Sequence, residues 1–192
     1  MGARPGRSAV VVPGRMFGPH TPLLMYAAQA AERRGARVYQ LQWPEEELAI
    51  ASASGEALSS WVTHYVGAAL DALDLVDAKP LIVGKSLATY AARVAAERDL
   101  PAVWLTPLLA EAYVVDALRD SLRPFLLVGG TADAFGWDSR VAHALSPHVL
   151  EVEGADHGMF VPGELAASAT VLGSVATAIE QFFDEIIWVE DG

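Results

Sequence analysis

The sequence reads PLIVGKSLAT over residues 80–89. The apolar run before the glycine is typical of a strand buried on both faces of a parallel sheet. Apolar side chains after it recur at spacings of three and four, which places one apolar face on a helix. A strand that turns this sharply into a helix presents its central side chain outward and requires small flanking residues, here Gly84 and Ala88. Ser86 is therefore a candidate nucleophile.

Two other interpretations of this stretch compete. Gly84-Lys85-Ser86 is also the end of a phosphate-binding loop, but that motif requires a glycine where Lys79 stands, and residues 80–83 favour a strand. The simplest alternative is a serine that only caps a helix. The motif alone leaves the nucleophile and the cap about equally supported, so the rest of the sequence has to decide.

Composition limits the classes of protein. The chain has 192 residues, 53% of them hydrophobic and 19% charged, which suits one compact soluble domain over residues 1–192. It has no cysteine, which excludes disulfides, thiolate catalysis and cysteine-based metal sites. The net charge of −11 argues against nucleic acid and against anionic membranes as partners. No apolar run approaches the ~20 residues of a membrane span, and the N-terminal apolar run is too short for a signal peptide, so a cytoplasmic location is expected.

Strand and helix patterns alternate along the chain. Strands are expected over residues 8–12, 37–43, 80–83, 101–105, 125–128 and 148–152, and helices over 22–34, 55–75, 86–99, 109–120, 137–145 and 163–187. Polar and apolar side chains alternate in residues 37–43, which indicates an edge strand; Pro44 and the three glutamates after it are expected to form an exposed turn. Leu165 and Leu172 are expected to face inward from the last helix. The alternation predicts an α/β fold, a three-layer sandwich with a mainly parallel sheet of about six strands.

The carboxyl ends of these strands carry the polar residues of interest. Ligands of open parallel sheets bind outside those ends. Ser86, Asp133 and His157 each follow a predicted strand, as do the loop 14–18 and Thr106. The pattern thus gathers a serine, an aspartate and a histidine along one edge of the sheet.

That order of residues is the order found in α/β-hydrolases. The chain resembles the small, cap-less members of that family in residues 84–88, 130–133 and 154–157, and the resemblance covers nearly the whole chain. It implies an α/β-hydrolase fold without a cap domain and a serine hydrolase that cleaves carboxylic esters or thioesters through an acyl-enzyme, with no cofactor. The chain departs from many relatives in carrying Pro13-Gly14 where they carry His-Gly, and the two further strands with which that fold often begins are not expected here.

Each residue of the expected triad has a chemical reason. A serine hydroxyl is a weak nucleophile at neutral pH and requires an adjacent base. His157 would take the proton of Ser86 and return it to the leaving group, while Asp133 would hold the other imidazole nitrogen. Asp156 is an alternative acid, but neighbours on a turn rarely point at each other, so Asp133 is preferred.

The developing oxyanion would require two fixed N–H donors. The backbone of Leu87, at the start of a helix, is expected to supply one. Arg15 in the first loop, or with less support Met16, is expected to supply the other.

The substrate region is less defined by the sequence. The segment in which family members carry a lid is short, so an open, shallow site is expected. Its expected walls are Met16, Phe17, His20, Leu108, Leu109 and Tyr113. Lys85 is either a solvated residue or part of an ion pair. The other histidines show no ligand spacing, so no metal site is proposed.

Other functions remain compatible with the same motifs. The fold also serves catalytically silent proteins that make protein contacts. Acyl transfer or a lyase reaction would use the same triad. The expected partner is a small-molecule ester or thioester, and the sequence does not set the oligomeric state.

Overall fold

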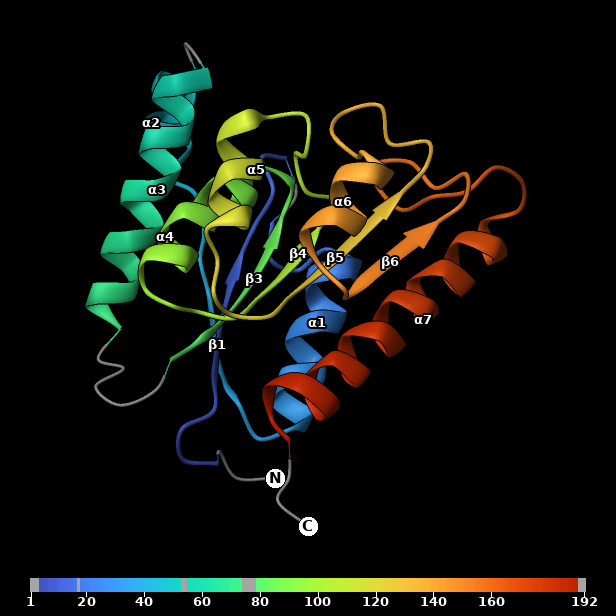
Figure 1. Cartoon of the computed structure of the whole chain (residues 1–192), viewed down its shortest axis with the longest axis horizontal. Coiled ribbons are helices and arrows are strands. Elements are labelled where there is room, and N and C mark those ends of the chain that lie inside the picture. Colours follow the sequence, from blue (N-terminus) through green and yellow to red (C-terminus); the bar gives the residue numbers. More distant parts are fainter. Residues whose placement is uncertain (1–3, 17, 53–54, 74–78, 190–192) are drawn as a thin grey trace.

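The computed structural model describes residues 4–16, 18–52, 55–73 and 79–189. Six parallel strands form one sheet in the order β2-β1-β3-β4-β5-β6 (Figure 1). The strands are β1 (Ser8–Val12), β2 (Arg37–Gln40), β3 (Leu81–Lys85), β4 (Ala102–Leu105), β5 (Phe125–Gly130) and β6 (Val149–Val152). The predicted parallel sheet of about six strands is therefore confirmed.

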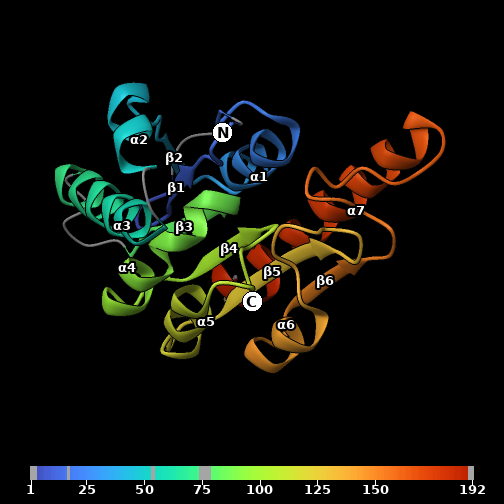
Figure 2. The ribbon, with the colours of Figure 1, turned by 90° about the horizontal axis from the view of Figure 1, so that it is seen from above.

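Helices cover both faces of the sheet. They are α1 (Pro22–Arg33), α2 (Glu45–Ala51), α3 (Gly55–Ala72), α4 (Ala92–Glu97), α5 (Ala112–Arg119), α6 (Ser139–Leu145) and α7 (Leu165–Phe182), with a 3-10 helix η1 (Ser86–Ala91) and a π-helical turn η2 (Phe183–Ile187). Figure 2 shows α1 and α7 on one face and α3 to α6 on the other. The result is the three-layer sandwich that the sequence predicts.

Alternate residues of each central strand pack into two separate cores, one on each face of the sheet. In β1, Val10 and Val12 pack with α3 to α5, whereas Ala9 and Val11 pack with α1 and α7. Successive side chains of a strand point to opposite faces, so a central strand buried on both sides is apolar throughout. This explains why β1 and β3 read as continuous apolar runs. The edge strand β2 is partly exposed, as its alternating sequence indicates.

Several boundaries differ from the expectation. The three glutamates after Pro44 begin the helix α2 instead of an exposed turn, because carboxylates in a first turn interact favourably with the helix dipole. The chain after Ser86 first forms the 3-10 helix and only then an α-helix. Leu165 was expected to face inward, but it is 73% exposed at the start of α7. Residues 74–75 of the helix predicted over residues 55–75 lie outside the described residues.

The last helix also satisfies a membrane criterion. Within the described part of the chain, one helix, Leu165–Ile187, is long and apolar enough to cross a membrane by length and composition alone. The core helix of a soluble protein meets the same test. Here Val175, Ile179 and Phe182 of α7 pack into the core shared with α1 and the sheet.

The strand order reverses between β1 and β3. The chain leaves β1 to form β2 on one side and returns to form β3 on the other. Such a switch point leaves a crevice outside the carboxyl ends of the two strands, where ligands of α/β sheets bind. The loop after β1 begins at Pro13, and Ser86 follows β3, so both border this crevice.

Gly84 is predicted to be required for the fold of β3. A methyl group at this position would lie 2.6 Å from a ring carbon of Trp104 and 2.9 Å from the Cβ of Ala88, both in the core. Gly84→Ala should therefore lower the free energy of unfolding by about 1–3 kcal/mol through overpacking. Gly173→Ala is the matched control, because an added methyl group in this helix meets no atom within 4 Å. It should be neutral or stabilising by up to about 1 kcal/mol. Urea unfolding measures both changes, and equal stability of the two variants would contradict the argument.

Candidate active site

Ser86 is the first residue of η1, directly after β3, and its backbone is strained at this turn. Its φ of 52° lies in the left-handed region, which residues other than glycine rarely adopt. The loop after β1 approaches the same turn, since a methyl group on Gly14 would lie 3.5 Å from the carbonyl oxygen of Lys85 and 3.8 Å from the Cβ of Ser86. Strain of this kind persists only where the surrounding structure enforces it, and it gathers at functional sites.

Three side chains that are distant in sequence meet beside this turn. The Nε2 atom of His157 lies 2.8 Å from Oγ of Ser86, and its Nδ1 atom lies 2.8 Å from Oδ2 of Asp133. The Asp133 side chain is fully buried, and its other oxygen accepts a hydrogen bond from the backbone N–H of Phe135 at 2.9 Å. Both carboxylate oxygens are therefore held in place, and the imidazole bridges the carboxylate and the hydroxyl.

The loop after β6 gives Asp156 a different position. One of its carboxylate oxygens accepts hydrogen bonds from the backbone N–H groups of Gly158, at 2.8 Å, and Phe160, at 2.9 Å. Asp156 therefore braces the loop that carries His157 and does not pair with the imidazole. The choice of Asp133 over Asp156 as the partner of His157 agrees with the geometry.

The loop after β1 is held by a residue that sequence reasoning did not single out. The indole N–H of Trp43 lies 3.0 Å from the carbonyl oxygen of Pro13 and 3.2 Å from that of Gly14. Arg15 follows directly in this loop, and Leu87 is the second residue of η1, after Ser86. The two expected oxyanion donors thus belong to segments that approach each other at Gly14. Nothing in the local sequence around Trp43 indicated this contact.

The sequence left the role of Lys85 open. It is only 2% exposed, and its ammonium group donates hydrogen bonds to Oγ1 of Thr106 and to the carbonyl oxygen of His157, both at 2.9 Å. Thr106 is itself strained, with a φ of 44°. Lys85 thus links the ends of β3 and β4 to the loop that carries His157.

Burial changes the acidity of this lysine. Removal from water lowers the pKa of Lys85 from 10.5 to about 8, while the negative charges of Asp133 and Asp156 oppose the shift. With this pKa, most Lys85 side chains carry the positive charge below about pH 8. At neutral pH the site therefore holds a buried cation next to the carboxylate–imidazole pair.

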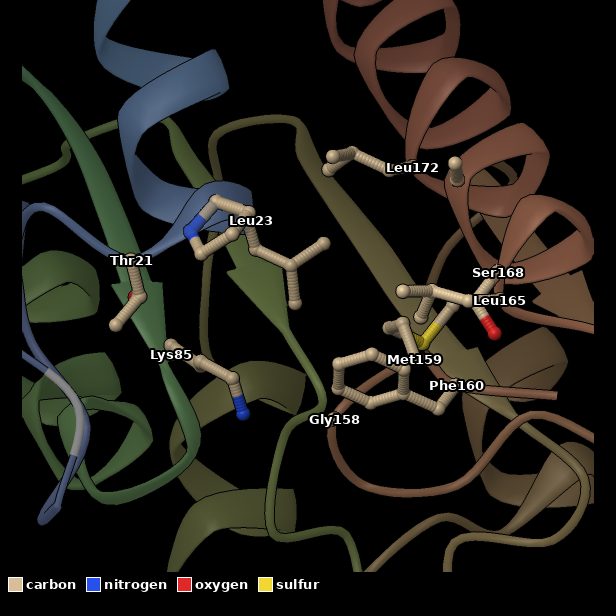
Figure 3. Close-up of a pocket in the computed structure, with 11 residues that line it drawn as sticks. Thr21, Leu23, Lys85, Gly158, Met159, Phe160, Leu165, Ser168 and Leu172 are labelled. Carbon is tan, nitrogen blue, oxygen red and sulfur yellow. The ribbon is translucent and has the colours of Figure 1, made fainter.

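The expected substrate walls lie apart from the cavity that the structure shows. Met16 is 88% exposed and His20 is exposed, Leu108 is half-buried, and Leu109 belongs to the core. Tyr113 contacts the hydroxyl of Thr63 on α3. Phe17 lies outside the described residues. None of the five described positions lines the cavity shown in Figure 3.

That cavity has a volume of about 290 Å³ and lies between the first turns of α1 and α7. Lys85 and the loop that carries His157 complete its walls (Figure 3). The sequence predicted an open, shallow site because the segment in which family members carry a lid is short. Separately, it assigned Leu165 and Leu172 of α7 to the core, so it did not predict this cavity.

Metal ligands do not gather here or elsewhere in the described segments. Over residues 4–16, 18–52, 55–73 and 79–189, no three histidine, aspartate or glutamate side chains are grouped as a metal ion would require.

Comparisons with known proteins identify the fold. No family model matches the chain, and no curated protein matches it. Among solved structures, Est1E from Butyrivibrio proteoclasticus with ferulic acid bound is similar, with a TM-score of 0.67 and 15% identity over 94% of this chain and 89% of that chain. A dienelactone hydrolase from Anabaena variabilis has a TM-score of 0.61 and 20% identity over 94% and 88%. An α/β serine hydrolase without a lid from Xanthomonas campestris has a TM-score of 0.52 and 13% identity over 94% and 86%.

Identities of this size show the fold alone. The chain has the α/β-hydrolase fold, with no cap domain in the described residues, and the resemblance to small cap-less α/β-hydrolases is confirmed.

Lys85 provides a test of the electrostatics of this site. Its pKa in the folded protein lies below its value in the unfolded chain, so the charged form opposes folding. This opposition is complete below pH 8 and disappears as the pH rises toward 10.5, so stability should rise with pH in this range. Between about pH 7.5 and about pH 9.5, the wild-type protein should gain about 1–2 kcal/mol of unfolding free energy relative to Lys85→Met. Urea unfolding of both proteins at the two pH values measures this gain, and an identical pH dependence would show that the ammonium is not desolvated.

Proposed function

We propose that the protein is a serine hydrolase that cleaves carboxylic esters or thioesters through an acyl-enzyme. The observation that carries this proposal is the position of the His157 imidazole, 2.8 Å from both the Ser86 hydroxyl and the Asp133 carboxylate. A hydroxyl next to a base, with that base oriented by a buried acid, is the arrangement that activates serine for attack on a carbonyl carbon.

The proposed reaction has two steps. Oγ of Ser86 bonds to the carbonyl carbon of the substrate while its proton passes to Nε2 of His157. The tetrahedral intermediate collapses, the bond to the leaving alcohol or thiol breaks, and the imidazolium returns the proton to the leaving group. Water then attacks the acyl-enzyme in the same way, which releases the carboxylic acid and restores the serine. Asp133 stabilises the imidazolium and keeps Nδ1 as the protonated nitrogen of the neutral ring.

The backbone is proposed to stabilise the negative charge of the intermediate. Leu87 would donate its N–H from the start of η1, and Arg15 would donate from the loop that Trp43 holds. Each donor of this type contributes ~3 kcal/mol of transition-state stabilisation. The approach of Gly14 to Ser86 supports the pairing of these two segments.

The proposal also covers the partners and the cellular location of the protein. The substrate is a small molecule, and nucleic acid and anionic membranes are disfavoured as partners by the net charge of −11. We also propose a cytoplasmic location. The ferulic acid bound to Est1E is a carboxylic acid, and the dienelactone hydrolase is named for a lactone, which is a cyclic ester; both fit ester chemistry on this fold.

A fluorophosphonate probe tests whether Ser86 is activated. The wild-type protein should be labelled, and Ser86→Ala should lose both the label and at least about 10⁴-fold of ester hydrolysis, since removing the nucleophile leaves only binding and oxyanion contributions. Labelling is read by mass spectrometry and hydrolysis with p-nitrophenyl acetate. A folded wild-type protein that neither reacts with the probe nor hydrolyses esters would favour a catalytically silent role.

Substitutions of Asp133 and Asp156 test which of the two aspartates is the acid of the proposed triad. Asp133→Asn should lower kcat by about 10⁴-fold, because the amide favours the wrong imidazole tautomer. Asp156→Asn should retain activity within about tenfold, because an amide oxygen can still accept the N–H groups of the loop. Comparable losses in both variants, measured at equal folded fraction, would contradict the assignment of Asp133.

A further inference from the structure

A cavity of about 290 Å³ lies beside the proposed triad, and the function proposed above does not use it. Three of the segments that build the site continue into its wall. Lys85 precedes Ser86, Gly158 follows His157, and Thr21 ends the loop that carries Arg15. The cavity is therefore bordered by the direct sequence neighbours of Ser86 and His157.

The helices around the cavity explain why it exists. Arg34, just after α1, pairs with Glu180 near the end of α7 and with Asp184 in the following turn η2, which holds the two helices together there. The cavity lies between their first turns, at the carboxyl edge of the sheet, where α7 begins with the exposed Leu165 (Figure 3). The space thus opens at the end of the helix pair that faces the site.

The polar groups on the wall are already bonded to protein. The hydroxyl of Thr21 donates to the carbonyl oxygen of Gly18, and that of Ser168 bonds to the backbone of Val161. The Lys85 ammonium points to Thr106 and to the carbonyl of His157, so its alkyl stem faces the cavity. The remaining walls, Leu23, Met159 and Leu172 among them, are apolar. Such a surface favours an uncharged hydrocarbon group over an anion.

We propose that this cavity binds the acyl group of the substrate, and that the protein prefers esters of apolar acids with about six to ten carbons. This inference rests on the proposed hydrolase function. The volume accommodates roughly ten non-hydrogen atoms at ~30 Å³ each. Gly158 places no side chain between His157 and the cavity, and the ring of Phe160 packs over this glycine, since a methyl group there would lie 2.8 Å from the ring. Phe160 and Leu165, 54% and 73% exposed, form an apolar rim.

The test compares p-nitrophenyl octanoate with p-nitrophenyl acetate. In the wild-type protein, kcat/KM should rise from acetate to octanoate, by up to about fourfold for each methylene that enters the cavity. Ala169 lies on the wall, and Ala169→Phe should lower the octanoate-to-acetate ratio of kcat/KM at least about tenfold by filling the space. Ala167→Phe, at an exposed position of the same helix that does not line the cavity, is the matched control and should leave both rates unchanged.

A variant with the opposite effect guards against simple misfolding. Leu172→Ala enlarges the cavity and should move the preferred chain length upward by about two carbons. Fluorophosphonate labelling of each variant reports whether Ser86 is still active. If labelling is intact and the octanoate-to-acetate ratio is the same in all variants, the acyl group binds elsewhere and this proposal is wrong, while the hydrolase function stands. If the wild-type protein is not labelled and hydrolyses neither ester, both proposals are overturned.

Discussion

The turn at Ser86 is the constraint on which the site depends. A φ of 52° lifts the serine out of the strand direction and places its hydroxyl above the sheet, but a side chain in this region is strained. The turn is possible because its surroundings are small: Gly84 leaves room for Trp104, and Gly14 lets the first loop approach. The same close approach brings the loop that carries Arg15, the expected oxyanion donor, toward Ser86. One local conformation therefore determines both the position of the hydroxyl and the distance to its neighbours.

A buried cation stabilises the rest of the arrangement. Taking an ammonium group out of water is unfavourable, and the lowered pKa of Lys85, about 8, reflects that penalty. The hydrogen bonds to Thr106 and to the His157 carbonyl partly offset it. These hydrogen bonds link the ends of β3 and β4 to the loop that carries His157. A loop histidine has few packing contacts of its own, so a bond to its backbone restricts the motions that would separate it from Ser86. Retaining a destabilising group at this position is consistent with a role in the site.

The sequence predicted the central part of the molecule well. The strands of the buried sheet are short apolar runs that end at glycine or proline, and parallel strands must place their following loops on one edge, so the meeting of Ser86, Asp133 and His157 could be expected. The partner of Trp43 could not, because it depends on how an edge strand twists over a loop 30 residues away in sequence. Lys85 was ambiguous for a related reason. Alternation along β3 places it on the α1 and α7 face, but the sequence does not show whether water reaches that end of the strand.

The cavity between α1 and α7 is the feature that the sequence pattern did not predict. Leu165 and Leu172 recur at helical spacing with the buried residues of α7, and periodicity alone assigns all of them to one core. Periodicity describes the face of a helix and not its distance from the next element. Because the ion pairs of Arg34 hold α1 and α7 together at one end, Leu165 and Leu172 at the other end line a cavity, although Leu172 also packs against the core. If Ser86 is the nucleophile we propose, apolar side chains that line a cavity next to it are suited to receive an apolar substrate, and the leucines that the sequence assigns to the core would determine specificity.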